Sequence, residues 1–230
     1  MLFLGSMEYD RALQLQMRIS EAKKREFVED VLLLLEHPPT ITLGRNGKWN
    51  HLLVPEQALA ARGIARCEVD RGGDITSHGP GQLVGYPILE LGTRERDVHR
   101  YMRNLEELVL RLLNSYGISG TRRDHFTGVW TDDGKIAALG VHISRWITRH
   151  GFALNVCTDL SFFDLIVPCG ISGAGIASMA SILGRAVKLE EVAGRLVPFF
   201  GAVFDRSMTL ISEPDLYRRI GGHAHQNAVA

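Results

Sequence analysis

The spacing of apolar residues predicts several amphipathic helices. Between residues 97 and 115 they recur every three or four positions, as on one face of a helix, and Asp97 is a suitable N-terminal cap. Residues 6–25 have a similar pattern, which predicts a helix capped by Ser6. Its buried face is predicted to contain Leu13 and Met17. Further helices are predicted over residues 55–62 and 189–204.

Shorter apolar runs, separated by turn-forming residues, predict strands. The longest aliphatic run covers residues 31–35, and the His-Pro-Pro sequence at 37–39 ends that strand because proline cannot continue a central strand. The Asp-Asp-Gly sequence at 132–134 lies between two strand-like runs, and Asp-Gly in that position predicts a hairpin. The remaining predicted strands include residues 66–70, 83–90, 150–157 and 181–183.

This order of elements predicts an α/β protein of the α+β type. Strands come in hairpins and in runs, with helices between them, rather than in the repeating strand-helix units of a parallel sheet. We therefore expect a mixed, largely antiparallel sheet flanked by helices. No repeat or linker divides the sequence, so residues 1–220 are predicted to form a single domain, and the small and polar residues 221–230 a disordered tail.

The composition is that of an ordinary globular protein, since 45% of the 230 residues are apolar and 23% are charged. Lysine and arginine together number 26, as do aspartate and glutamate, so the net charge predicts neither nucleic-acid nor membrane binding. The run at 31–35 is too short to span a bilayer, and the N-terminus lacks the basic segment of a signal peptide. We expect a cytoplasmic protein.

The three cysteines, Cys67, Cys157 and Cys169, predict neither disulfides nor a zinc site by their number and spacing. Cys67 and Cys157 lie in strand-like runs and are predicted to be structural. Cys169 differs, because Pro168 precedes it and Gly170 follows it, so backbone N–H groups can approach a group bound to the sulfur. The local sequence fits a nucleophilic thiol and a buried structural cysteine equally well.

A nucleophilic cysteine needs a base or a positive neighbour that converts the thiol to a thiolate. Lys135 follows the Asp-Gly turn and begins an apolar run at 136–141, where a lysine is either a solvated strand end or a side chain folded over a site. The glycine-rich segment 71–85 is either an elaborate turn or a wall for an apolar ligand, with Arg71 and His78 as polar anchors.

Two glycine-rich sequences are only superficially similar to nucleotide-binding loops. GRNGK at 44–48 lacks the spacing of a phosphate-binding loop and the hydroxyl residue after its lysine. GISGAG at 170–175 lacks the glycine spacing of the dinucleotide fingerprint. Neither sequence therefore predicts a nucleotide site.

Four segments resemble, in order and spacing, the motifs of the lipoyl(octanoyl) transferases. They are EHPPTITLGR at 36–45, RGGDITSHGPGQLVGYP at 71–87, GKIAALGVHISRWITRHGFALNV at 134–156 and VPCGI at 167–171. The resemblance extends from about residue 8 to about residue 206. It implies a single domain like the catalytic domain of biotin and lipoyl protein ligases. It also implies transfer of an octanoyl group from acyl carrier protein to a lysine of a lipoyl domain.

The resemblance also implies roles for individual residues. Cys169 is expected to carry the acyl group as a thioester, and Lys135 to act as its partner. The expected acyl pocket consists of Arg71, Gly72, Gly73, Asp74, Ile75, Thr76, Ser77, His78, Ala138, Leu139, Gly140, Gly151, Phe152 and Ala153. His78 and His142 each either orient the site or are structural. A monomer without metal or cofactor is expected, which acts on the lipoyl domains of 2-oxoacid dehydrogenases and on the glycine cleavage H protein.

Three alternative functions remain open on the sequence. An ATP-dependent lipoate or biotin ligase has a related fold, but it activates the acid as an adenylate and needs no cysteine at position 169. The others are a non-catalytic acyl- or carrier-binding module and a thioesterase that uses Cys169. Acyl carrier proteins are acidic, so one basic surface is expected to bind the carrier, and the candidate arginines are Arg94, Arg96, Arg100, Arg103, Arg122, Arg123, Arg145 and Arg149.

Overall fold

The computed structural model describes residues 1–25, 28–124, 126–167 and 175–221. The strands are β1 (Leu2–Ser6), β2 (Val31–Glu36), β3 (Thr40–Leu43), β4 (Ala65–Glu68), β5 (Ile75–His78), β6 (Gln82–Ile88), β7 (Thr121–Arg123), β8 (Phe126–Thr131), β9 (Gly134–Ser144) and β10 (Ile147–Asn155). The α-helices are α1 (Tyr9–Lys24), α2 (Glu56–Ala61), α3 (Val98–Asn114), α4 (Met179–Leu183), α5 (Leu189–Phe204) and α6 (Glu213–Arg219). Short 3₁₀ helices are η1 (Trp49–His51), η2 (Thr93–Glu95) and η3 (Leu160–Leu165).

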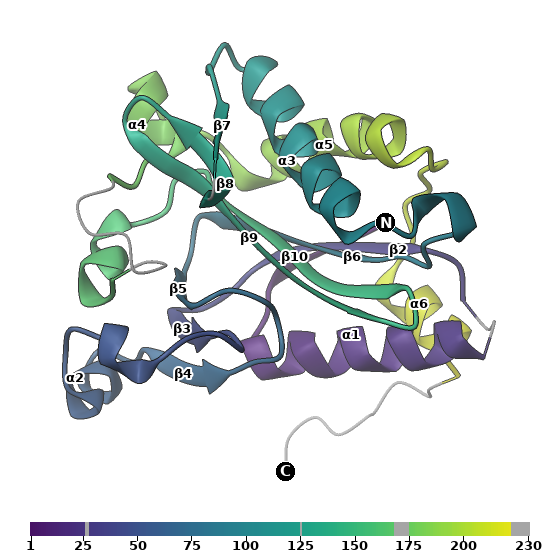
Figure 1. The fold of residues 1–230 in the computed structure, drawn as a ribbon, viewed down its shortest axis with the longest axis horizontal. Coiled ribbons are helices and arrows are strands. Elements are labelled where there is room, and N and C mark those ends of the chain that lie inside the picture. Colours follow the sequence, from purple (N-terminus) through teal and green to yellow (C-terminus); the bar gives the residue numbers. More distant parts are fainter. Residues whose placement is uncertain (26–27, 125, 168–174, 222–230) are drawn as a thin grey trace.

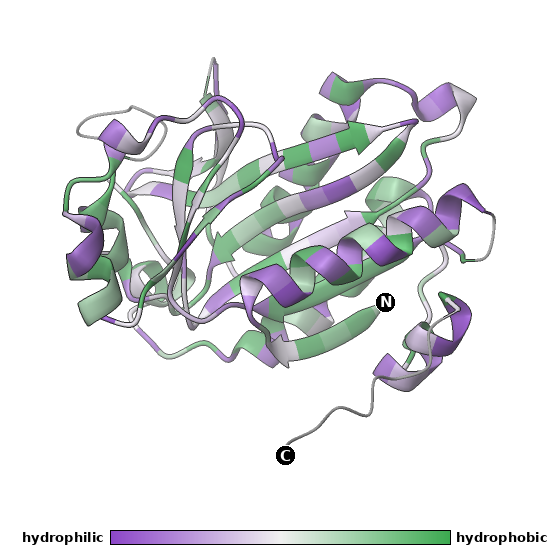
Figure 2. Ribbon diagram, turned by 90° about the horizontal axis from the view of Figure 1, so that it is seen from below, coloured by the Kyte–Doolittle hydropathy of each residue, from purple (hydrophilic) through white to green (hydrophobic). Residues whose placement is uncertain are grey.

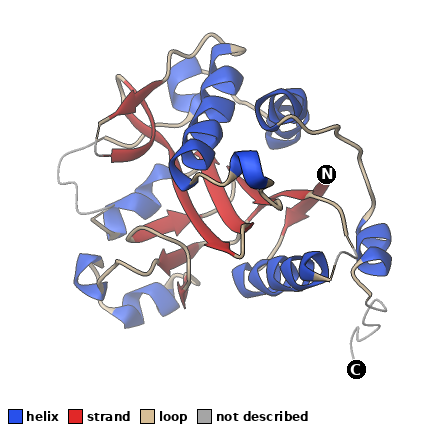
Figure 3. Cartoon of the chain, turned by 45° about the vertical axis from the view of Figure 1, so that its right-hand side comes forward, coloured by secondary structure: helices blue, strands red, loops and turns tan. Residues whose placement is uncertain are grey.

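The strands form two sheets. Seven of them make the main sheet, in the order β1-β2-β6-β10-β9-β8-β7, and three make a smaller sheet, β4-β3-β5. Only the pairs β1–β2 and β3–β4 are parallel, which confirms the predicted mixed, largely antiparallel arrangement. Figure 1 shows α3 and α5 on one face of the main sheet and α1 and α6 on the other. Helices lie outside both sheets (Figure 3).

Alternation along the strands divides the core between the two faces of the main sheet. Leu32 and Leu34 of β2 pack on the side of α3 and α5, whereas Leu33 and Leu35 pack on the side of α1. The whole aliphatic run is buried for this reason. Figure 2 shows hydrophobic residues along the strands and a mixture of hydrophilic and hydrophobic residues along α1. No helix among the described residues is long and apolar enough to cross a membrane.

Local signals correctly predicted the elements that build the site. The side chain of Asp97 caps α3 by accepting a hydrogen bond of 3.0 Å from the backbone N–H of Arg100. The Asp-Gly turn joins β8 and β9 into the predicted hairpin, in which Thr131 pairs with Gly134. Gly134 has φ +139, a conformation that side chains rarely adopt.

The prediction for the first helix was wrong at its start and on its face. Helix α1 begins at Tyr9, and Ser6 ends strand β1, because the short apolar run before it pairs with β2. Met17 is 53% exposed, and the buried face contains Ala12, Leu15 and Ile19 instead.

The strand predicted at 181–183 is also wrong, because these residues belong to helix α4. The side chain of Ser178 accepts a hydrogen bond of 3.1 Å from the backbone N–H of Ser181, which starts a helix at this point. The predicted disordered tail, apart from Gly221, lies outside the described residues.

Candidate active site

A cavity of about 590 Å³ lies between the two sheets. Its walls come from the middle of β9 and β10, from β5 and the preceding loop 71–74, and from α3 and the start of β8. Every residue predicted for the acyl pocket lines this cavity except Ser77. Ser77 is 2% exposed, and its carbonyl oxygen accepts a hydrogen bond from the side chain of Gln82. Folding therefore brings the three predicted segments, 71–78, 138–140 and 151–153, together at one cavity. That they bind an acyl chain stays a prediction.

The apolar wall of the cavity depends on glycines that allow backbones to approach closely. A Cβ at Gly151 would lie 2.3 Å from the carbonyl oxygen of Gly85, and one at Gly140 would lie 2.9 Å from that of Gly72. Gly72 also donates a hydrogen bond of 2.9 Å from its backbone N–H to the carbonyl oxygen of Val141. The loop is thus held against β9, with no side chains between the two backbones.

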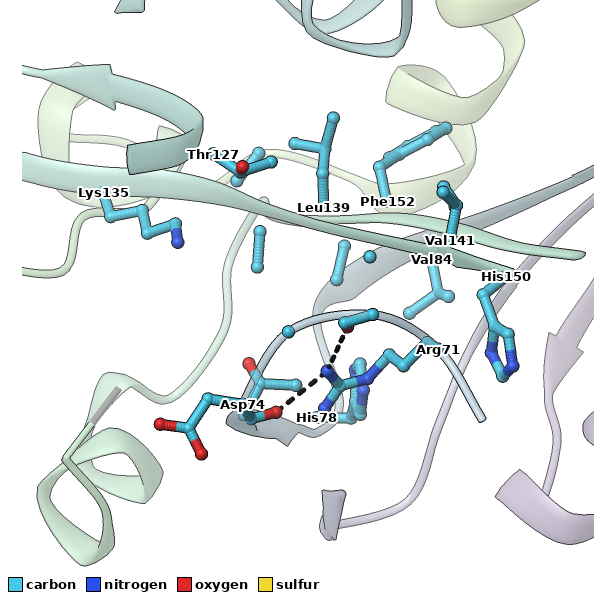
Figure 4. Close-up of a pocket in the computed structure, with 18 of the residues that line it drawn as sticks. Arg71, Asp74, His78, Val84, Thr127, Lys135, Leu139, Val141, His150 and Phe152 are labelled. Carbon is cyan, nitrogen blue, oxygen red and sulfur yellow. Dashed lines mark hydrogen bonds between the residues drawn. The ribbon is translucent and has the colours of Figure 1, made fainter. Parts of the chain in front are cut away.

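Arg71 fixes the loop that forms the opposite wall. Its guanidinium donates to the carbonyl oxygen and to the hydroxyl of Thr42, at 2.9 and 2.7 Å, and to the carbonyl oxygen of Asp74 at 2.9 Å. Figure 4 shows this guanidinium below the cavity, between Asp74 and His150. Because the side chain is 7% exposed and bonded to main-chain oxygens, it holds the wall in place.

His78 lies in a buried, ordered set of amide and hydroxyl groups. Its Nδ1 donates to the side-chain oxygen of Gln82 at 2.8 Å, and the amide nitrogen of Gln82 donates to the side-chain oxygen of Asn155 at 2.9 Å. Burial holds the pKa of His78 well below its usual value, so the ring is neutral. His78, which the sequence left between two roles, lines the cavity and is also part of its framework.

His150 was missed by the sequence analysis, although it lines the cavity. It has φ +56 within β10, and its ring Nε2 donates to the carboxylate of Asp70 at 2.7 Å. This hydrogen bond is the main reason why the pKa of the Asp70 carboxyl lies well below its usual value. Figure 4 shows His150 and Lys135 at opposite ends of the cavity. A strained backbone beside a cavity is a frequent mark of a functional position.

Tyr9 and Tyr86 line the cavity, and the buried ring of His37 lies behind them. His37 Nδ1 donates to the carbonyl oxygen of Met7 at 2.6 Å, so its Nε2 accepts a hydrogen bond of 2.7 Å from the hydroxyl of Tyr86. Burial lowers the pKa of His37 to about 4 and raises the pKa of Tyr9 to about 12. All three rings are therefore neutral near pH 7, since burial also raises the pKa of Tyr86.

Lys135 is 7% exposed and lines the cavity, which is the buried alternative of the two that the sequence allowed. Its ammonium nitrogen lies 5.4 Å from the centre of the Trp130 ring. A Cβ at Gly128 would lie 2.6 Å from Lys135 Cε, so that glycine leaves room for the end of the lysine side chain.

Cys169 lies outside the described residues, but Phe163 before it and Ile176 after it both line the cavity. Before it, the backbone N–H of Val167 donates to the carbonyl oxygen of His51 at 2.8 Å. After it, Ile176 lines the cavity and pairs with Lys135 in a parallel bridge. The proximity of Cys169 to Lys135 stays a prediction.

The other two cysteines have no activating neighbour. Burial, followed by the charge of Asp10, raises the pKa of the Cys67 thiol to about 11. Burial and nearby glutamates also raise the pKa of the Cys157 thiol, which is exposed after β10. Within the described part of the chain, no three His, Cys, Asp or Glu side chains are arranged to hold a metal ion.

Neither His142 nor any of the candidate arginines lines the cavity. The Nδ1 of His142 is 3.3 Å from the carbonyl oxygen of Asp70, and burial lowers the pKa of this ring. Arg149 is paired with Asp70, and Arg103 and Arg122 are both paired with the buried carboxylate of Glu106.

Comparisons with known proteins agree on one family. The family model "Lipoyl protein ligase A/B catalytic domain" matches residues 8–201. An octanoyltransferase from Caldicellulosiruptor saccharolyticus is 44% identical, over 93% of this chain and 92% of the relative. An octanoyltransferase from Solibacter usitatus is 50% identical, over 89% of this chain and 92% of the relative.

Solved structures with the same fold are more distant in sequence. A lipoate-protein ligase A bound with ATP superposes with a TM-score of 0.77 at 16% identity, over 95% of this chain and 91% of that one. A bipartite lipoate protein ligase from Thermoplasma acidophilum superposes with a TM-score of 0.75 at 17% identity, over 95% and 89% of the two chains. At this identity the superpositions establish the fold.

Proposed function

Because this chain belongs to the lipoyl protein ligase A/B catalytic domain family, we propose that it is an octanoyltransferase of protein lipoylation. The donor is octanoyl-acyl carrier protein, and the acceptor is a lysine of a lipoyl domain. The acyl group is carried in between as a thioester on Cys169, with Lys135 as the partner of the thiol.

One observation carries this proposal. A buried lysine, Lys135, lies at one end of an otherwise largely apolar cavity, and its main chain is bonded to the residues that follow the cysteine segment. An apolar cavity of about 590 Å³ suits a medium-length acyl chain. A lysine at the end of the cavity can take a proton from the thiol or the amine that attacks the acyl carbonyl, and return it to the departing sulfur.

In the first half of the reaction, the Cys169 sulfur attacks the thioester carbonyl of the donor. Lys135 takes the thiol proton, the new carbon–sulfur bond forms, and the bond to the carrier sulfur breaks. The departing carrier thiolate then receives the proton from Lys135. The acyl group is a thioester both on the carrier and on Cys169. It therefore stays activated, and no nucleotide is consumed.

In the second half, the neutral ε-amine of the acceptor lysine attacks the acyl-enzyme. The carbon–nitrogen bond forms, Lys135 takes a proton from the nitrogen, and the bond to Cys169 breaks. Lys135 returns that proton to the cysteine sulfur, which restores the starting state. The product is an amide, so the step is driven by the conversion of a thioester to a more stable acyl group.

The acceptors that fit this reaction are the lipoyl domains of 2-oxoacid dehydrogenases and the glycine cleavage H protein. We propose that the enzyme acts as a monomer. A nucleophilic cysteine must stay reduced, which favours the cytoplasm.

Activity without ATP separates this proposal from a ligase. The purified protein is mixed with octanoyl-acyl carrier protein and an apo lipoyl domain, and amide formation is followed by mass spectrometry. Transfer without ATP is expected, and it is lost in Cys169→Ser. Transfer from free octanoate that requires ATP would support the ligase. Full transfer by Cys169→Ser would support a carrier-binding module, and release of free octanoate alone would support a thioesterase.

A further inference from the structure

The segment GRNGK, residues 44–48, lies at the mouth of the cavity. Asn46 lines the cavity and is exposed, as are Arg45 directly before it and Lys48 two positions after it. Two apolar residues of the lining, Val98 of α3 and Phe126 of β8, are also 44% exposed. The segment 44–48 is therefore one place where the cavity meets solvent.

The backbone of this segment is fixed. Its N–H groups at positions 44, 45 and 46 donate to carbonyl oxygens of the loop 71–74, at 3.2, 3.0 and 3.2 Å. A Cβ at Gly44 would lie 2.4 Å from the carbonyl oxygen of Gly73, so only glycine allows this approach. The segment thus holds two basic side chains at a defined place beside the opening.

The two basic side chains are not neutralised by neighbouring acids. Asp74 is bonded to His51 at 2.6 Å, and Asp70 is paired with Arg149 and His150. Among the described residues, the side chains of Arg45 and Lys48 form no hydrogen bond or ion pair. By contrast, Arg103 and Arg122 are both paired with the carboxylate of Glu106.

We infer that Arg45 and Lys48 bind the phosphate of the arm that carries the donor thioester. The inference rests on the proposed function, because a thioester donor presents its acyl group on a phosphorylated pantetheine arm, on a carrier protein or in coenzyme A. An acyl chain inside the cavity leaves the rest of the arm at the mouth. Two unpaired cations there favour a phosphate, through charge-assisted hydrogen bonds. The sequence GRNGK serves as an anion site without the spacing of a nucleotide loop.

The test compares thioester donors with and without a phosphate on the pantetheine arm. The double variant Arg45→Gln/Lys48→Gln is assayed with octanoyl-pantetheine, octanoyl-phosphopantetheine, octanoyl-coenzyme A and octanoyl-acyl carrier protein. We expect KM to rise about tenfold or more for the three phosphorylated donors, because charge-assisted hydrogen bonds are lost, and to stay unchanged for octanoyl-pantetheine. The charge-preserving variant Arg45→Lys/Lys48→Arg keeps a low KM. Arg62→Gln, an exposed arginine at the end of α2, is the matched control.

The outcomes separate this inference from the proposed function. Equal KM changes for all four donors, or none for any, would overturn the phosphate site while leaving transfer intact. A change confined to the carrier protein would also overturn it, because the segment would then recognise the carrier surface. If the unaltered protein transfers octanoyl from none of the donors, the proposed function fails instead. Both side chains are exposed, so the variants are expected to fold, which thermal unfolding checks.

Discussion

The backbone N–H of Lys135 donates a hydrogen bond of 2.8 Å to the carbonyl oxygen of Gly175. A second hydrogen bond, of 3.0 Å, joins the backbone N–H of Ala177 to the carbonyl oxygen of Lys135. The chain that leaves the cysteine segment is therefore attached to the strand that carries the buried lysine. This attachment is the structural basis on which Cys169 and Lys135 are proposed to act together.

Substitution of Gly175 is expected to damage transfer by disturbing this attachment. A Cβ at Gly175 would lie 2.6 Å from the carbonyl oxygen of Asp133, so Gly175→Ala pushes the two backbones apart. A displacement of about 1 Å at a reacting group costs on the order of a hundredfold in rate. We expect kcat for transfer to fall by about that factor, measured at saturating donor.

Gly194→Ala is the control for that variant. Gly194 lies inside α5, and a Cβ there would meet nothing within 4 Å. Because alanine favours a helix over glycine, unfolding is expected to require about 0.5–1 kcal/mol more, with transfer unchanged. A similar loss of kcat in both variants would mean that the attachment at Gly175 has no special role.

Filling the cavity is expected to change which acyl chains are transferred. Ala138 lines the cavity from β9, and Ala138→Leu adds volume where the acyl chain is proposed to lie. We expect kcat/KM to fall much more for octanoyl than for butanoyl donors. Ala61→Leu, on the exposed end of α2, is the control. It should leave the ratio of kcat/KM for octanoyl to kcat/KM for butanoyl donors unchanged. An unchanged ratio in Ala138→Leu would place the acyl chain elsewhere.

Stability is expected to fall between about pH 6.5 and pH 4. The pKa of His37 is about 4 in the folded protein, against the ordinary histidine value of 6.5 in the unfolded chain, so the unfolded chain binds more protons between these values. The contribution of His37 is complete above pH 6.5 and is lost as the pH falls towards 4. It amounts to up to about 3 kcal/mol, and His78 acts in the same direction.

Urea unfolding at pH 7.5 and at pH 5 measures this effect. The free energy of unfolding should be lower at pH 5, and His37→Gln should reduce the difference between the two values. His99→Gln, which replaces an exposed histidine of α3, should retain the full difference. Equal differences in His37→Gln and His99→Gln would show that His37 is not the group responsible.

The cysteines outside the proposed site are expected to be dispensable. The thiol pKa of Cys67 is raised to about 11 and that of Cys157 is raised as well, so neither is a thiolate near pH 7. The double variant Cys67→Ser/Cys157→Ser should therefore retain full transfer and the same octanoyl adduct. Loss of the adduct in this variant would indicate that the wrong cysteine has been assigned.

Much of the fold could be predicted, because its strongest elements have local signals. The regular spacing of apolar residues and the cap at Asp97 locate α3, and the Asp-Gly turn locates the β8–β9 hairpin. The strand β1 was not predicted, because its five residues are too few to show a clear pattern. They form a strand because they pair with β2. The face of α1 was also wrong, because Met17 and Leu13 compete with a second apolar stripe through Ala12, Leu15 and Ile19.

The candidate site was predictable only in part. The pocket residues came from family motifs, and local patterns alone left Lys135 open between a solvated strand end and a buried side chain. His150 and Asp70 lie 80 positions apart and meet through tertiary contacts, so neither has a local signal. The positive φ of His150 could not be located from the residue type, because only a small share of histidines adopts this conformation even though histidine is enriched in it. The segment 44–48 was dismissed for its spacing, whereas its position at the mouth depends on its pairing with the loop 71–74.

Intact-mass spectrometry of the protein mixed with octanoyl-acyl carrier protein tests the central claim most directly. We predict one octanoyl adduct, mapped to Cys169 by peptide analysis, which disappears when an apo lipoyl domain is added and its lysine becomes octanoylated. In Lys135→Ala the adduct should form and disappear far more slowly. The absence of any adduct, or an adduct that a lipoyl domain does not discharge, would contradict the proposed transfer.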